Sequence, residues 1–329
     1  MASCLAAIIC AAFILQAGIH KPDRTYAEFP VRQQENTLSI KEKSTGTDST
    51  GQWGISAIMA TEAWKITSGK AGTIIAVLDT GIDEEHEDLS GQVIDKANFT
   101  SSPTTKDVYG HGTHIAGIIA SKNNDYGITG VAYNCRLLNV KVADDGGWLD
   151  EHALAKGIRW AVDHEARVIN ISLYTLKESR DVEEAVDYAW SNGVLIVGSS
   201  GNGVGEKAVY PASYDNCMAV AATNSDNEIP AWSGIGKWVN MAAPGVAILS
   251  TMPDNRYERK SGTSMASAYA AGVAGLLYSL IPEAANRSSQ NSLIRTIIKN
   301  SCGTSDTSSI GHINALKAVQ AMISQQGSR

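Results

Sequence analysis

Short apolar runs alternate with amphipathic stretches of helical period from about position 53 onward. The apolar runs that are typical of buried strands lie at 73–78, 136–142, 167–173, 194–199 and 218–222. Between them, helical patterns cover 112–121, 151–164 and 180–192. Parallel strands that are apolar on both faces need helices on both sides of their sheet. The pattern therefore predicts an α/β fold with three layers, α/β/α, around a mostly parallel central sheet.

The first fifty positions do not follow this alternation. An uncharged apolar run from Leu5 to Leu15 has the length of the hydrophobic part of a secretory signal, although no positive charge precedes it. We expect 1–19 to be a signal peptide; a membrane anchor and a wrongly assigned start codon are the alternatives. Residues 20–51 are polar and aperiodic, which indicates a linker or short pro-segment. No internal repeat divides the remainder, so 52–329 is interpreted as one domain.

Composition excludes some classes of function. The 329 residues carry a net charge of −7, and no run of Lys or Arg forms a basic stripe, which argues against a nucleic-acid partner. Beyond the N-terminal run, the cysteines are Cys135, Cys217 and Cys302. Three is an odd number, so at most one intrachain disulfide can form. Their spacing matches no metal motif.

Chemistry is first suggested where the strand at 73–78 leads into Asp79-Thr80-Gly81. An aspartic protease has two such carboxylates, and the sequence contains no second copy of the triplet. Asp79 must therefore have other partners.

A second motif is "YGHGTHIAGIIAS", in which His111 begins a helix between two glycines that allow other backbone to approach closely. His111 and His114 could bind a metal, but His-Glu-x-x-His is absent and no acidic third ligand is near. Taken alone, His111 is better explained as a structural histidine than as a functional one.

The third motif is "SGTSMASAYAAGVAGLLYSL", where Ser264 begins a helix that is apolar or small on every face and should be buried. The N-terminus of such a helix stabilises negative charge that develops at the serine hydroxyl. The alternative is an ordinary N-cap serine.

Together the motifs supply an acid, a base and a nucleophile in the order Asp79, His111, Ser264. The segments "VLDTGID", "GHGTHIAG" and "SGTSMAS" resemble the three signature segments of the subtilisin family, and the similarity extends from about Trp53 to Val319, with the thermitase-like branch the most similar. The resemblance implies a subtilisin-like fold. It also implies a secreted serine endopeptidase, made as a zymogen, that cleaves protein or peptide substrates. No stable membrane partner is expected, and the protein should be a monomer.

The resemblance also assigns roles to further residues. Asn202 in "GSSGNG" matches the family's oxyanion-hole asparagine. Substrate would lie extended along the loop 143–148 and the segment 172–174, and the residues expected to contact it are Ser172, Leu173, Tyr174, Gly201 and Val209. Val209 would form an uncharged pocket floor, which implies broad specificity with a mild preference for an apolar P1 residue.

A structural Ca²⁺ is a further implication of the resemblance. Its ligands would be the Asp88 carboxylate, the Asn124 side chain and the carbonyls of Lys122, Tyr126 and Ile128, which are all oxygen donors. The alternative is an ordinary polar turn.

Some residues depart from the family pattern. Tyr174 stands where most relatives have glycine, and Ala268-Tyr269 replaces the usual Pro-His behind the nucleophile. The pro-segment is also short. These departures are the argument for a rival hypothesis, a weakly active or inactive subtilisin-like protein that binds peptides. The intact positions Asp79, His111, Ser264 and Asn202 argue against it.

Overall fold

The computed structural model describes residues 51–282, 287–303 and 309–327, preceded by two short strands, β1 (Thr25–Tyr26) and β2 (Thr37–Leu38). The expected signal peptide and most of the expected pro-segment lie outside the described residues. Within the described part of the chain, no helix has both the length and the apolar character needed to cross a membrane.

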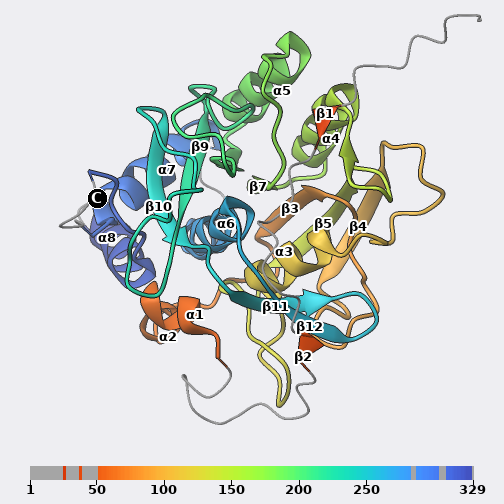
Figure 1. Ribbon diagram of the computed structural model, residues 1–329. Helices are drawn as coiled ribbons and strands as arrows, with labels where there is room; N and C mark the ends of the chain where they lie inside the picture. Colours follow the sequence, from red (N-terminus) through yellow and green to blue (C-terminus); the bar gives the residue numbers. More distant parts are fainter. Residues whose placement is uncertain (1–24, 27–36, 39–50, 283–286, 304–308, 328–329) are drawn as a thin grey trace, which may run out of the picture.

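A seven-stranded sheet forms the centre of the molecule, and every neighbouring pair of strands in it is parallel. Its strand order is β10-β9-β8-β7-β3-β5-β4 (Figure 1). In that order the bounds are Val239–Pro244, Cys217–Thr223, Leu195–Ser199, Val168–Ile171, Ile74–Asp79, Arg136–Lys141 and Val93–Asn98.

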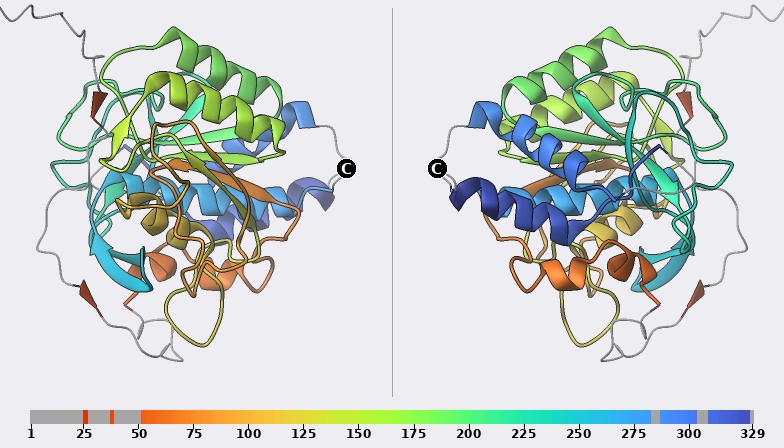
Figure 2. Two further views of the ribbon diagram at one scale, coloured as in Figure 1. Left: turned by 90° about the vertical axis from the view of Figure 1, so that its right-hand side faces the viewer. Right: turned by 90° about the vertical axis from the view of Figure 1, so that its left-hand side faces the viewer.

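Helices cover both faces of this sheet (Figure 2). One face packs against α4 (Glu151–Asp163) and α5 (Arg180–Ser191). The other packs against α3 (His111–Ala120) and α6 (Thr263–Ser279), with α1 (Trp53–Ala57), α2 (Ala60–Ala63), α7 (Gln290–Ser301) and α8 (Ala315–Gly327) around them. A 3₁₀ turn, η1 (Arg287–Ser289), precedes α7. The predicted three-layer α/β fold is confirmed.

Two small antiparallel sheets lie outside the central layer. In one, β11 (Ile248–Met252) pairs with β12 (Arg256–Lys260), and β12 pairs with β2. In the other, β6 (Trp148–Leu149) pairs with β1. Both early strands are thus held by backbone pairing to the domain that follows them.

Each predicted strand and helix is present, with ends that differ by no more than two residues. The apolar pattern missed β4 and β10, the two edge strands of the large sheet. β4, with the sequence VIDKAN, has no buried residue, so its polar residues hide the strand pattern. The three cysteines at 135, 217 and 302 are free thiols, so the disulfide that the sequence allowed is not formed among them.

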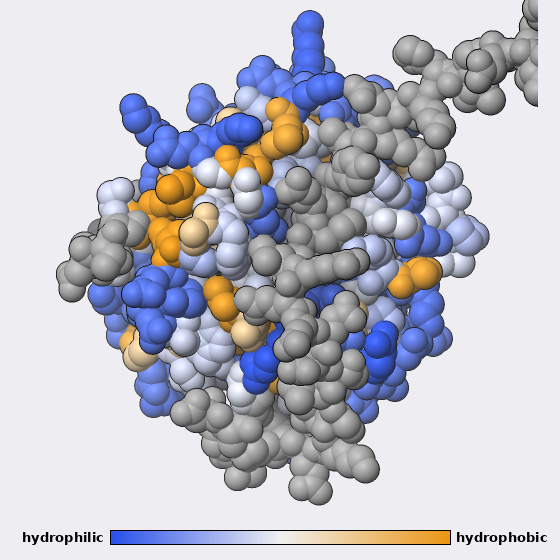
Figure 3. All heavy atoms as spheres, in the orientation of Figure 1, coloured by the Kyte–Doolittle hydropathy of each residue, from blue (hydrophilic) through white to orange (hydrophobic). Residues whose placement is uncertain are grey.

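The topology brings several strand ends to one edge of the sheet. Asp79 is the last residue of β3, which lies between β5 and β7. Ser172 follows β7, and Asn202 follows its neighbour β8 closely. The C-terminal ends of parallel strands are the usual location of a site in such sheets. The face seen in Figure 1 is mostly hydrophilic where its residues are described, with a group of hydrophobic residues at its upper left (Figure 3).

Candidate active site

Asp79 and His111 form a buried pair at the end of β3. Oδ1 of Asp79 lies 2.7 Å from Nδ1 of His111, and the two side chains are 0% and 1% exposed. The same oxygen accepts a hydrogen bond from the Thr80 N–H at 2.8 Å. A Cβ at Gly112 would lie 2.0 Å from the carbonyl oxygen of Gly81, so only glycine allows the start of α3 to lie this close to β3.

Asp107 connects the two segments that carry this pair, and the sequence analysis missed it. Its buried carboxylate accepts four hydrogen bonds, from the hydroxyl of Thr80 at 2.8 Å, the N–H of Gly110 at 2.7 Å, and the N–H and hydroxyl of Thr113 at 2.8 and 2.7 Å. Burial raises the pKa of Asp107, and the four donors oppose that change because they stabilise the carboxylate. The sequence could have suggested Asp107 by its position four residues before His111.

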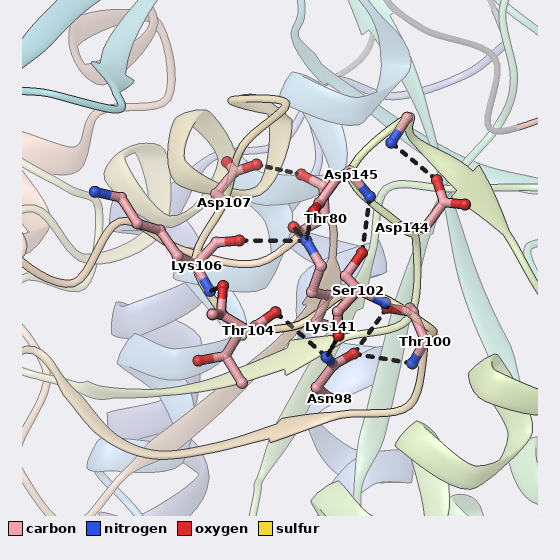
Figure 4. Close-up of polar contacts among 12 residues, drawn as sticks. Thr80, Asn98, Thr100, Ser102, Thr104, Lys106, Asp107, Lys141, Asp144 and Asp145 are labelled. Carbon is pink, nitrogen blue, oxygen red and sulfur yellow. Dashed lines mark hydrogen bonds and ion pairs between the residues drawn. The ribbon is translucent and has the colours of Figure 1, made fainter.

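Lys141, the last residue of β5, is a second residue that the sequence analysis missed (Figure 4). Its fully buried ammonium group donates to the carbonyl of Thr80 and, at 3.3 Å, to that of Lys106. It also lies 2.9 Å from Oδ1 of Asp145. One cation thus joins the backbone next to Asp79 to the loop at 143–148.

Ser264 is the second residue of α6, whose residues from Thr263 to Tyr278 are all buried, as the sequence predicted. The hydroxyl of Ser264 donates to the carbonyl oxygen of Ser172 at 3.0 Å. The hydroxyl of Ser172 in turn donates to the carbonyl oxygen of Ser264 at 3.0 Å. These reciprocal bonds join the end of β7 to the N-terminus of α6.

Asn202 lies beside the same helix end. Its Oδ1 accepts hydrogen bonds from the N–H of Thr263 at 3.0 Å and from the Thr263 hydroxyl at 3.1 Å. The hydroxyl of Thr263 also accepts from the N–H of Gly201 at 3.1 Å. With its oxygen held in this way, Asn202 has a buried Nδ2 that meets no acceptor among the described residues. A buried donor without a partner is costly, and a developing oxyanion would satisfy it.

Tyr174 is buried and does not project into solvent. Its hydroxyl lies 3.2 Å from the carbonyl oxygen and 3.3 Å from the nitrogen of Asn202, so it can donate to the first and accept from the second. Its ring packs on Val209, which is itself 0% exposed. Leu173 points away from this cluster into the core beneath α4 and α5, so only its backbone could contact substrate.

The loop at 143–148, expected to be the second substrate-binding edge, forms a tight turn. Asp144 accepts from the N–H groups of Gly146 and Trp148 through its side chain, at 2.9 and 3.0 Å, and from Gly147 through its carbonyl, at 2.8 Å. The Asp144 N–H donates to Trp148, and the Asp145 N–H to a serine hydroxyl. All five N–H groups from 144 to 148 are therefore already used inside the protein, and β1 pairs with Trp148 and Leu149. A substrate strand here would have to bond to carbonyl groups.

The residues predicted to bind calcium do come together around Asp88. Its carbonyl accepts from the Lys122 N–H, Oδ1 from Asn124 Nδ2, and Oδ2 from the Ile128 N–H, each at 2.9 Å. Tyr126 is exposed, and its N–H reaches Oδ1 of Asn124 at 3.4 Å. The segment 122–128 thus curves around one buried carboxylate.

The donor set fits Ca²⁺ in type, because every candidate ligand is an oxygen. The Asp88 carboxylate already contacts three protein donors, the third being the hydroxyl of Tyr257 at 2.9 Å. Burial raises the pKa of Asp88. The Asn124 Nδ2 now donates to Asp88. For a cation to bind here, the Asn124 amide would have to turn so that its oxygen, in place of Nδ2, faces the Asp88 carboxylate. The described residues contain no group of three or more His, Cys, Asp or Glu side chains that could hold a metal ion. With a single carboxylate among its ligands, the site should bind Ca²⁺ weakly.

His114 has a structural role in this arrangement. It is fully buried, and its Nε2 donates to the carbonyl oxygen of Glu258 in β12 at 3.1 Å. Burial holds the pKa of His114 well below its ordinary value. His111 instead contacts Asp79, so the two histidines do not form a metal-binding pair.

Comparison with known proteins identifies the family of this chain. A family model described as the subtilase family matches residues 70–320. Thermitase of Thermoactinomyces vulgaris is 41% identical over 278 residues, which cover 83% of this chain and 97% of thermitase. Subtilisin Savinase of Lederbergia lenta is 39% identical over 269 residues, 82% and 98% of the two chains. The minor extracellular protease Epr of Bacillus subtilis is 37% identical over 283 residues, 84% of this chain and 43% of Epr. The chain belongs to the subtilase family of serine proteases.

Proposed function

We propose that this subtilase is a secreted endopeptidase in which Ser264 is the nucleophile, His111 the general base and Asp79 the residue that orients the base. The observation that carries the proposal is the 2.7 Å contact between Asp79 and His111, made by two almost fully buried side chains. A buried carboxylate on Nδ1 fixes the tautomer of the imidazole and leaves Nε2 to accept a proton.

Catalysis would begin when the Ser264 hydroxyl turns from the carbonyl of Ser172 toward His111. His111 takes the hydroxyl proton as Oγ attacks the scissile carbonyl, and Asp79 stabilises the imidazolium that forms. His111 then donates the proton to the leaving amine, and water attacks the acyl-enzyme by the same steps in reverse order. Nδ2 of Asn202 and the N–H of Ser264 would bind the oxyanion of each tetrahedral intermediate.

Protein or peptide substrates would bind as an extended strand beside Ser172–Tyr174, with Gly201 on the opposite side. The N–H groups of the loop at 143–148 are already used within the protein. This loop should therefore form fewer hydrogen bonds with the substrate than Ser172–Tyr174 does. The pro-segment at 20–51 would keep the enzyme a zymogen. The pairing of Thr25–Tyr26 with Trp148–Leu149 supports this role, because Thr25–Tyr26 then pairs with the loop edge that was expected to bind substrate.

Secretion is supported by the apolar run at 5–15 and by the similarity to a relative named as extracellular. We also propose that the enzyme acts as a monomer and binds one structural Ca²⁺ weakly. Asp88, Asn124 and the carbonyls of Lys122, Tyr126 and Ile128 would hold the ion. It would stabilise the 122–128 loop and take no part in the reaction.

A fluorophosphonate probe tests the mechanism, because it reacts only with an activated serine. We expect one labelled serine, Ser264, and hydrolysis of denatured casein. Ser264→Ala should abolish both while the protein stays folded, with a loss of roughly 10⁶ in kcat, as for the nucleophile of a subtilisin. Ser191→Ala is the matched control, because Ser191 is an exposed serine at the C-terminal end of α5. A folded wild-type protein that takes up no probe would instead support the peptide-binding hypothesis.

A further inference from the structure

The position of the P1 side chain, which belongs to the residue that supplies the scissile carbonyl, follows from the proposed site. The carbonyl carbon must lie next to Oγ of Ser264, and its oxygen next to Nδ2 of Asn202. The P1 side chain is attached to the Cα atom that is bonded to that carbon. It must therefore enter the space between the two backbone segments that meet here, 172–175 and 201–202, since the carbonyl of Ser172 is 3.0 Å from the Ser264 hydroxyl.

That space holds the side chain of Tyr174. Its hydroxyl contacts both main-chain polar groups of Asn202, the residue whose amide would bind the oxyanion. A Cβ placed on Gly201 would lie only 3.4 Å from Cζ of the ring and 3.1 Å from Cγ1 of Val209, so the ring fills the gap up to the opposite backbone.

The ring is also firmly packed. Tyr174 is 3% exposed and forms a buried apolar cluster with Val209, Ala212 and Ala219, against which Val204 and Trp238 pack. The antiparallel bridge between Thr175 and Tyr210 holds the segment after Tyr174 on the segment after Val209. To leave this position, the ring would have to expose its apolar face and release its contacts with Asn202.

We propose that Tyr174 occupies the volume of the P1 side chain and restricts cleavage to bonds that follow glycine or alanine. The proposal rests on the proposed serine protease mechanism and narrows its substrate class. In this proposal the Tyr174 ring, and not Val209 as expected from the sequence, forms the floor of the P1 pocket, because Val209 lies beneath the ring and is not open to substrate. The apolar P1 preference thereby becomes a preference for small residues. The contacts with Asn202 also make Tyr174 a positioning residue for the oxyanion-binding amide.

The test is a set of peptide substrates that share P4–P2 and carry Gly, Ala, Leu or Phe at P1. We expect wild-type kcat/KM to be about 10-fold or more higher for Ala than for Phe, the discrimination typical of a pocket that cannot hold the larger group. Tyr174→Gly should raise kcat/KM for the Phe substrate by about 10-fold or more relative to the Ala substrate. Tyr174→Phe, which keeps the ring and removes the hydroxyl, should keep the wild-type order of preference.

A second measurement does not depend on the variants. The wild-type enzyme is allowed to digest denatured casein, and mass spectrometry identifies the residue before each cleaved bond. Enrichment of Gly and Ala at P1 supports the proposal, even if Tyr174→Gly fails to fold. Enrichment of Leu, Phe or Tyr, or equal wild-type kcat/KM for Ala and Phe, overturns it while the serine mechanism stands. Absence of probe labelling and of all cleavage overturns both.

Discussion

The carboxylate of Asp107 provides a direct test of how the start of α3 is held. Asp107→Asn replaces one carboxylate oxygen with an NH₂ group. Each oxygen accepts from one hydroxyl and one main-chain N–H: Thr80 and Gly110 on one side, and both groups of Thr113 on the other. In either orientation, the new NH₂ group faces one hydroxyl and one main-chain N–H. The hydroxyl can rotate and accept a hydrogen bond from the NH₂ group. The main-chain N–H can only donate, so it loses its acceptor.

The size of the effect follows from that count. One buried N–H without an acceptor costs about 1–3 kcal/mol, and the loss of negative charge weakens the remaining bonds by about 1 kcal/mol more. A total of about 2–4 kcal/mol lowers the Tm of a domain of this size by about 4–16 °C. Because His111 lies between Gly110 and Thr113, its imidazole should also move. A displacement of about 1 Å costs on the order of 10²-fold in rate.

The assay is thermal unfolding together with kcat and KM on a peptide with alanine at P1. We expect kcat to fall much more than KM rises, because His111 is the proposed general base of the chemical step. Asp163→Asn is the matched control, since this exposed carboxylate accepts one hydrogen bond, from the hydroxyl of Tyr188 at 2.7 Å. It should change the free energy of unfolding by about 0.5 kcal/mol or less. If Asp107→Asn has a wild-type Tm and wild-type kcat, Asp107 does not hold His111 in place.

Two further predictions concern stability. Chelation with EDTA should lower Tm and added Ca²⁺ should restore it, because the proposed ion would bind only the folded state. Asn124→Asp, which places a second carboxylate beside Asp88, should enlarge the Ca²⁺-dependent shift in Tm. Equal Tm values with EDTA and with Ca²⁺ in both proteins would contradict the proposed site. Acidification should also destabilise the protein, because burial keeps the pKa of His114 far below 6.5, so the unfolded chain binds a proton that the folded state does not. This stability is present above pH 6.5 and is lost as the pH falls, by up to about 2 kcal/mol at pH 5. His114→Gln, whose amide can still donate to the Glu258 carbonyl, should make Tm depend less on pH. If Tm depends on pH as strongly in this variant as in the wild type, other groups cause the pH dependence.

The sequence alone was sufficient to predict the central architecture and to recognise the three signature segments. The strands β3, β5, β7, β8 and β9 are continuous apolar runs because both of their faces are buried, so their pattern is local and strong. The edge strand β4 was missed because none of its residues is buried and its composition is mixed. The edge strand β10 was missed because Asn240 and Pro244 interrupt its apolar pattern. Short motifs likewise identify Asp79, His111 and Ser264, because each lies within a distinctive local context.

Tertiary structure decided what those residues contact. Asp107 and Lys141 lie in segments with no distinctive pattern, and their importance comes from partners that the fold brings to them from other strands and loops. The sequence marks Tyr174 as unusual but leaves open whether its ring points into the cleft or toward solvent. That direction depends on the space left between the ends of β7 and β8, and on whether a buried hydroxyl can find partners there. The main chain of Asn202 supplies both a donor and an acceptor. Packing and hydrogen-bond satisfaction therefore place the ring inside, and both are properties of the folded chain rather than of any one segment.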